Sequence, residues 1–114
     1  MPPDDLARLE HMVHAAEQII RATEDRSRTH LDEDWIFAMG LIKGFEVIGE
    51  AAARVSPACQ HRHPLLPWSD MVGMRNRLVH GYFDIDLNIV WQTATVEVPD
   101  LVRRLREAVK IEQQ

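Results

Sequence analysis

The feature that most restricts the fold of this chain is a stripe of apolar residues at helical spacing in its first half. Apolar residues that recur every three or four positions are typical of an α-helix that buries one face. The stripe predicts a helix from near Asp32 to about Ser56, ended by Pro57, with a His- and Pro-rich loop over residues 57–66. The residues of the stripe are Ala38, Leu41, Ile42, Phe45, Ile48, Ala52 and Val55.

Helical spacing also extends over most of the remaining sequence. Residues 4–25 predict a first helix, residues 68–80 a third, and the segment after Asp84 or Asp86 a fourth. Pro99 should kink or split the fourth helix, because proline lacks an N–H and crowds the preceding turn. The expected fold is all-α, an up-and-down bundle of four long helices. The other predicted apolar faces are Leu6, Leu9, Val13, Ala16 and Ile20 in the first helix, and Leu101, Leu105, Ala108 and Val109 near the end.

Three glycines interrupt the interior of the second predicted helix. Gly40, Gly44 and Gly49 each cost about 1 kcal/mol relative to alanine in a helix interior. The simplest reason to keep them is that the backbone of another helix approaches this surface closely.

Length and composition restrict the class of protein. The 114 residues suit a single domain, spanning residues 1–114. Cys59 is the single cysteine, so no internal disulfide can form and a cytoplasmic location is expected. The polar N-terminus indicates no signal peptide, and no apolar run is long enough to cross a bilayer.

Charge is distributed unevenly along the chain. The net charge of −5 argues against strong nonspecific binding of nucleic acid. Residues 54–82 nevertheless carry a net charge of +3, and three histidines lie in the same segment. Its charged residues are Arg54, Arg62, Arg75 and Arg77 against Asp70.

Most of the chemically versatile side chains lie at residues 75–82. Arg75, Asn76, His80 and Tyr82 provide a guanidinium, an amide, an imidazole and a phenol within eight residues. On a continuous helix, Asn76 and His80 are neighbours, whereas Arg75 and His80 lie about 140° apart. Two copies of this helix could bring both groups to one ligand, which leads to the hypothesis of a dimer with a composite site.

Each of these residues also has a purely structural interpretation. Arg75 falls among apolar positions, with Trp68, Met71, Val72 and Val79, and could form a salt bridge with Glu46 or Glu50. His80 could be favoured by the dipole of a helix C-terminus, and Tyr82 could be a packing residue. Arg77 points away from Arg75 and is expected to be solvated or paired.

The segment resembles the Arg-x-x-x-x-His-x-Tyr motif of the HepT-like toxins, which belong to the HEPN superfamily of all-α ribonucleases. Arg75, His80 and Tyr82 match the motif, and Asn76 matches the polar residue that often follows the arginine. Residues 48–52, 67–68, 73–76 and 86–91 resemble further signatures of the family, in the same order.

The resemblance implies a homodimer and a partner antitoxin of the minimal nucleotidyltransferase (MNT) class, with which it could form a larger hetero-oligomer. It also implies that the antitoxin silences the toxin by transferring AMP to Tyr82.

The residue types suit metal-independent RNA cleavage, in which a ribose 2′-hydroxyl attacks the adjacent phosphate. His80 is the candidate proton acceptor or donor, and Arg75 can stabilise the charge that develops on the phosphate oxygens. Asn76 could orient His80 or bind a phosphate oxygen, and Tyr82 could stack on a base. No cofactor or metal is expected, and DNA should be refused because it lacks the nucleophile.

Cysteine, histidine and tryptophan side chains outside residues 75–82 are further candidates for functional sites. Cys59, His61 and His63 could ligate zinc, but the four-ligand set of a structural site is incomplete, and a solvated loop is the favoured interpretation. His11 and His14 are expected at the surface. The tryptophans Trp35, Trp68 and Trp91 are expected in the core or at a dimer interface.

Two alternatives remain open. The cluster of Arg103, Arg104 and Arg106 could contact RNA or form an ordinary solvated face with nearby glutamates. The competing function is a dimeric helical scaffold without catalysis, which binds a nucleotidyltransferase partner or a nucleotide.

Overall fold

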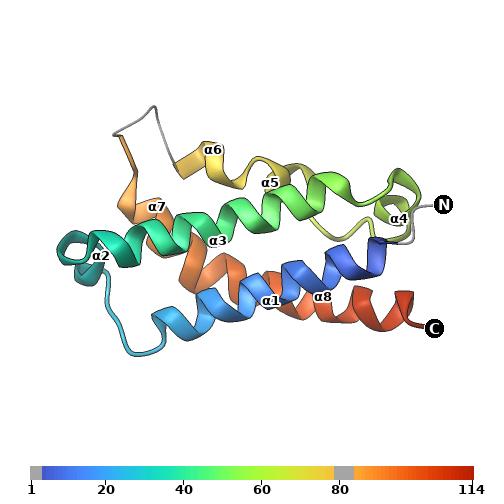
Figure 1. Ribbon diagram of the computed structural model, residues 1–114, viewed down its shortest axis with the longest axis horizontal. Helices are drawn as coiled ribbons and strands as arrows, with labels where there is room; N and C mark the ends of the chain where they lie inside the picture. Colours follow the sequence, from blue (N-terminus) through green and yellow to red (C-terminus); the bar gives the residue numbers. More distant parts are fainter. Residues whose placement is uncertain (1–3, 79–83) are drawn as a thin grey trace.

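The computed structural model describes residues 4–78 and 84–114, and the predicted all-α class is confirmed: these residues are largely helical (Figure 1). Among them, no helix has the length and hydrophobicity needed to cross a membrane. The helices are α1 (Asp5–Thr23), α2 (Thr29–Glu33), α3 (Trp35–Arg54), α4 (Pro57–Arg62), α5 (Trp68–Val72), α6 (Met74–Leu78), α7 (Leu87–Gln92), the π-helix η1 (Thr93–Glu97) and α8 (Val98–Glu112).

The long helices α1, α3 and α8 form the body of the bundle, in which α1 packs against both α3 and α8. The short helices α5 and α6 pack along α3 (Figure 1). Every residue of the predicted α3 stripe is buried. On α1, Leu9 and Ala16 are buried as predicted, but Leu6, Val13 and Ile20 are only partly buried. The α1 face that is buried is therefore rotated from the predicted one, and its other members are Met12, Ala15, Ile19 and Thr23.

The three glycines of α3 meet different surroundings. A Cβ atom on Gly49 would lie 2.9 Å from the carbonyl oxygen of Met71 in α5, so this position does require close backbone approach. At Gly44, the obstacle is the side chain of Ile19 in α1, at 2.9 Å. Gly40 faces open space, so the prediction of a close neighbour is wrong there.

The predicted third helix is divided at Gly73 into α5 and α6. The Gly73 N–H donates to the Ser69 carbonyl at 3.0 Å, and the Asn76 N–H donates to the Gly73 carbonyl at 3.0 Å. This turn changes which residues face the core. The buried set is Met71, Met74 and Leu78, whereas Val72, expected on the apolar face, is 47% exposed.

The predicted loop at residues 57–66 contains a short helix, α4. Pro57 begins α4 rather than merely ending α3, because proline suits the first helical turn. Ser56 caps α4, its hydroxyl accepting a hydrogen bond from the Cys59 N–H at 3.2 Å. Ser56 and Pro57, which both favour the start of a helix, are present in the sequence. The many histidines and prolines of this segment led instead to the prediction of a loop.

The fourth helix changes its winding before Pro99. It runs as α7 to Gln92, continues as the π-helix η1 over Thr93–Glu97, and returns to α-helical winding at Val98. Pro99 thus lies in the first turn of α8. A wider π turn just before it accommodates a residue that has no N–H and would crowd an α-helical turn.

The three tryptophans differ in burial. Trp68 and Trp91 pack partly buried against the core, and the Trp68 indole N–H donates to the His63 carbonyl at 2.9 Å. Trp35 is 68% exposed at the start of α3, beside the exposed Ile36. Trp35 is therefore not a core residue in this chain, and its predicted role at an interface stays a prediction.

Candidate functional site

The helix α6 is held by its apolar side. Met74 and Leu78 are buried, and α6 packs against α3 and α7. Asn76 and Arg77 are exposed. The burial of Met74 and Leu78 thus fixes a short helix on which Asn76 and Arg77 are exposed.

Asn76 lines a shallow groove of about 220 Å³ beside α3. Within the described residues the Asn76 side chain makes no hydrogen bond, so its amide is available to a ligand. Glu46 and Glu50 give one wall an acidic character, and Gly49 lets α5 approach α3 closely at this point. The residues that line the groove are Phe45, Glu46, Gly49, Glu50, Ala53, Val72 and Asn76.

The other predicted site residues are only partly described. Arg75 lies in α6, but its side chain is outside the described part of the structure; His80 and Tyr82 lie outside the described residues. The Asp86 N–H donates to the Leu78 carbonyl at 2.8 Å, so the end of α6 is joined to the residue just before α7. Asp86 also caps α7, accepting a hydrogen bond from the Ile89 N–H at 3.2 Å. Leu78 and Asp86, on either side of the residues outside the described part, are therefore held by hydrogen bonds.

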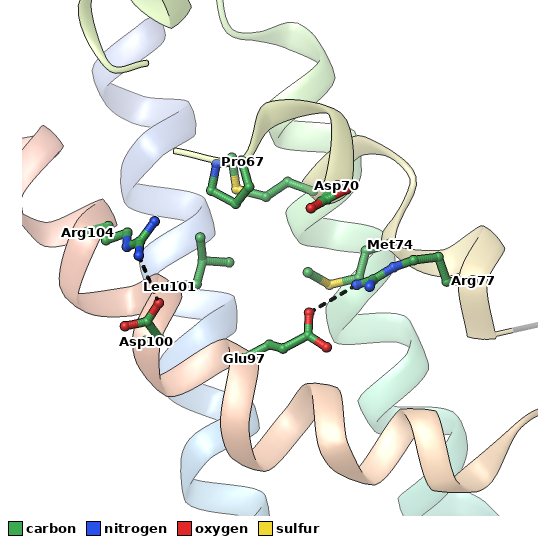
Figure 2. A pocket seen from close by; sticks show the side chains of 9 residues that line it. Pro67, Asp70, Met74, Arg77, Glu97, Asp100, Leu101 and Arg104 are labelled. Atoms are coloured by element: carbon green, nitrogen blue, oxygen red, sulfur yellow. Dashed lines mark hydrogen bonds and ion pairs between the residues drawn. The ribbon is translucent and has the colours of Figure 1, made fainter. Parts of the chain in front are cut away.

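A second cavity, of about 140 Å³, lies between α5 and α6 on one side and η1 and α8 on the other (Figure 2). Arg77 donates to Glu97 across it at 3.2 Å, which is one of the two outcomes expected for Arg77, solvated or paired. Arg104 lies 3.4 Å from Asp100 and also donates to the Leu65 carbonyl at 3.0 Å. The arginines of this cavity are therefore already engaged by acidic or carbonyl oxygens.

The predicted basic cluster near the C-terminus is also paired. Arg103 donates to Asp100 at 2.6 Å, and Arg106 donates to Glu17 of α1 at 2.7 Å. The hydrogen bond from Arg106 lowers the pKa of Glu17 below its usual value. These pairs favour the interpretation of an ordinary solvated face over that of an RNA contact.

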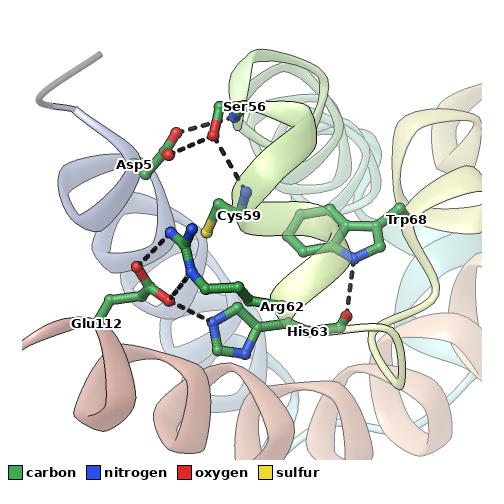
Figure 3. A network of polar contacts seen from close by, with 7 residues as sticks. All are labelled: Asp5, Ser56, Cys59, Arg62, His63, Trp68 and Glu112. Carbon is green, nitrogen blue, oxygen red and sulfur yellow. Dashed lines mark hydrogen bonds and ion pairs between the residues drawn. The ribbon is translucent and has the colours of Figure 1, made fainter. Parts of the chain in front are cut away.

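A third polar cluster joins α4 to the end of α8 (Figure 3). The imidazole Nε2 of His63 lies 2.7 Å from Glu112 Oε2, and Arg62 donates to the two oxygens of Glu112 at 3.0 and 2.8 Å. The hydrogen bond from Arg62, followed by that from His63, lowers the pKa of Glu112 to about 2. Burial, together with the charges of Glu112 and Asp5, raises the pKa of the Cys59 thiol.

This cluster differs from the group of Cys59, His61 and His63 considered as zinc ligands from the sequence. Cys59 and His63 do lie together, but His61 is exposed and outside the group. Glu112, which lies 49 residues after His63 in the sequence, occupies the place expected for His61. No local spacing could reveal that partner, because only the packing of α8 brings it there. His11 and His14 are exposed on α1, as expected.

Comparison with known proteins gives one family. The family model described as "Ribonuclease HepT-like" matches residues 12–108. A protein of Methanocaldococcus jannaschii named "Putative RNase" is 30% identical over 111 residues, covering 96% of both chains. A "Putative RNase" of Caldanaerobacter subterraneus is 29% identical, covering 91% of this chain and 93% of that protein.

A third relative, named "Probable ribonuclease HepT", comes from Thermococcus cleftensis. It is 32% identical over 88 residues, covering 74% of this chain and 80% of that protein. No solved structure gives a significant match. Residues 75–82, which carry the predicted motif, lie wholly inside the segment that the family model matches.

Proposed function

Because the chain belongs to the HepT-like ribonuclease family, we propose that it is a metal-independent endoribonuclease, the toxin of a toxin–antitoxin pair. The observation that carries the proposal is the complete set of Arg75, His80 and Tyr82 within the matched residues 12–108. The names of three relatives, each an RNase or ribonuclease, support the reaction class.

The proposed reaction is an attack of a ribose 2′-hydroxyl on the adjacent phosphate, which leaves a cyclic phosphate and a free 5′-hydroxyl. His80 accepts or donates the proton, since an imidazole titrates near neutral pH. Arg75 stabilises the phosphate oxygens of the transition state through its planar set of donors. Both products form without a metal-bound nucleophile, because the nucleophile belongs to the RNA itself.

Two polar residues of α6 bear on this proposal. The exposed amide of Asn76, beside the groove on α3, could hold a phosphate oxygen or orient His80. Arg77 faces the cavity between α6 and η1 and pairs with Glu97, so it is not assigned to catalysis. This leaves Arg75 as the arginine of α6 proposed for the substrate phosphate.

The experiment that tests the proposal is RNA cleavage in the presence of EDTA. Wild-type protein, shown by mass spectrometry to carry no AMP, should produce fragments with cyclic phosphate ends, and His80→Ala should not. If neither protein cleaves RNA, the non-catalytic scaffold is the better account. Cleavage that stops when EDTA is added would instead contradict the metal-independent chemistry.

We further propose that the protein acts as a cytoplasmic homodimer and is silenced by an MNT-type nucleotidyltransferase, which transfers AMP to Tyr82. An adenylate two residues from His80 would place negative charge beside the proposed site and compete with RNA for Arg75. Tyr82→Phe should keep its ribonuclease activity and resist the nucleotidyltransferase. Silencing of Tyr82→Phe by that enzyme, together with ATP, would contradict this role for Tyr82.

The dimer proposal has its own test. Arg75→Ala and His80→Ala, each inactive alone, would be mixed and allowed to exchange subunits. If one site takes its arginine and its histidine from different subunits, the mixed dimer contains one intact site and cleaves RNA. No recovery in a demonstrated mixed dimer would contradict a composite site.

A further inference from the structure

We propose that Cys59, His63 and Glu112 bind a divalent transition-metal cation of the zinc class, which fastens the segment after α3 to the end of α8. A sulfur, a ring nitrogen and a carboxylate oxygen from these residues all lie within 4.8 Å of one another. Bonds of about 2.0–2.3 Å place the ligands of a tetrahedral zinc ion roughly 3–4 Å apart. The three donors therefore need only small movements to reach one ion.

The ligand-bearing segments are held by contacts outside the cluster (Figure 3). Before α4, the Ser56 N–H and hydroxyl donate to the two carboxylate oxygens of Asp5 at 2.9 and 2.6 Å. After α4, the carbonyl of His63 accepts the indole N–H of Trp68. Cys59 is fully buried and His63 is 8% exposed. The cluster is thus a preorganised and enclosed group of donors, not a chance gathering at the surface.

The electrostatics of the cluster favour a positive charge at this point. Arg62 already supplies one, with its guanidinium on both oxygens of Glu112. The carboxylate of Glu112 lies within the cluster and that of Asp5 on Ser56 beside it, and these negative charges would attract a cation. Metal binding would form a sulfur–metal bond and release the thiol proton to solvent.

Arg62 would be displaced by the ion. Its side chain is 51% exposed, so the guanidinium can move into water without being stranded. Three protein ligands leave one position of a tetrahedral ion for a water molecule. The cluster lies near α4 and the C-terminus, and none of its three ligands belongs to α6 (Figure 1). The open fourth position distinguishes this site from a closed four-ligand structural site, and its place in the fold separates it from the proposed RNA cleavage.

The test is a titration of untagged, EDTA-treated full-length protein with Co²⁺, which replaces zinc and absorbs light. Cys59 is the only cysteine of the sequence, so a thiolate-to-cobalt charge-transfer band can report on no other residue. The expected result is one equivalent of Co²⁺ with this band, lost on addition of excess Zn²⁺. No charge-transfer band in the wild type would overturn the proposal directly.

Matched variants sharpen the test. Cys59→Ser should lose the band, and His63→Ala should weaken binding by about 100-fold or more, because loss of an outer-shell partner alone costs about 10–100-fold. His61→Ala, in the same segment but exposed, should bind as the wild type does. Arg62→Gln removes the competing cation and should tighten binding several-fold. An equal loss of Co²⁺ affinity in His63→Ala and His61→Ala would overturn the assignment. Weaker Co²⁺ binding by a folded Arg62→Gln would also overturn it.

Discussion

Segments 59–63 and 75–78 both belong to the basic part of the sequence but have different surroundings in the structure. Both carry arginine, and both belong to the positively charged stretch of the chain. Around α4, Arg62 and His63 both contact Glu112, and Cys59 is buried. On α6, Asn76 is exposed beside a groove, and its side chain makes no hydrogen bond within the described residues.

The difference shows how packing assigns polar residues to structure or to a ligand. Glu112 comes from the end of α8 and satisfies the polar groups of α4, so that cluster stabilises the fold. On α6, the buried anchors are apolar, Met74 and Leu78, and Asn76 and Arg77 are exposed, with Arg77 paired to Glu97. The arginine of each segment that the structure describes in full thus has an acidic partner from a distant part of the chain, so positive charge in the sequence does not by itself mark a ligand site.

The largest expected effect distinguishes His80, two residues beyond segment 75–78, from His61 of segment 59–63. His80→Ala should lower the rate of RNA cleavage by about 10²–10⁴-fold, the range for loss of a general acid or base. His61→Ala, exposed near α4, should cleave RNA at the wild-type rate. Initial rates on one RNA, with thermal melts of both variants to verify folding, make the comparison. Equal activity of the two variants would remove the basis for separating the segments.

Removal of Glu112 should weaken the fold. Its pKa falls from 4.5 to about 2 mainly through Arg62, which corresponds to about 2 kcal/mol at neutral pH after allowance for solvent around the half-exposed arginine. Because the pKa is lowered in the folded chain, this stability is present above pH 4.5 and is lost as the pH falls toward 2.

Glu112→Gln should therefore be less stable than the wild type to urea at pH 7, and the difference should shrink at pH 3. Glu107→Gln is the matched control on the same helix. Glu107 is exposed, and its ion pair with the exposed Lys110 is long, at 3.9 Å. A difference between wild type and Glu112→Gln that is the same at both pH values would contradict the ion-pair account.

Substitution of two glycines of α3 should change the free energy of unfolding by smaller amounts and in opposite directions. Gly49→Ala should reduce the free energy of unfolding by roughly 1–2 kcal/mol, because its Cβ would press on backbone carbonyls of α5. Gly40→Ala meets open space and should increase it by about 0.5–1 kcal/mol through helix propensity. Urea denaturation of both variants measures the pair. A stabilising Gly49→Ala would show that α5 does not sit tightly on α3.

A modest effect on catalysis is expected from the amide of Asn76. Asn76→Ala should lower the rate of RNA cleavage by about tenfold, or about 1.4 kcal/mol in the barrier, if the amide only supports His80 or a phosphate oxygen. Because Asn76 is exposed, the stability of the variant should stay close to that of the wild type. Kinetics with thermal melts test both expectations, and wild-type activity in this variant would remove Asn76 from the site.

The sequence predicted the elements that depend on local pattern. The buried stripe of α3 follows the spacing of its apolar residues, and α7 begins after Asp86, one of the two predicted starts. The division at Gly73 was missed, because a glycine inside a helical pattern does not by itself reveal a turn. The Cys59–His63–Glu112 cluster was missed because it depends on tertiary packing, and the geometry of His80 and Tyr82 stays a prediction.

The most direct test of the account uses an RNA whose cleavage position has been mapped. The ribose on the 5′ side of that bond would be replaced by 2′-deoxyribose, and the RNA would be incubated with AMP-free wild-type protein in EDTA. The account predicts that cleavage at this bond disappears, while cleavage at an unmodified control bond continues and leaves cyclic phosphate ends. Continued cleavage at the deoxy position would contradict attack by the 2′-hydroxyl, and with it the chemistry proposed for Arg75 and His80.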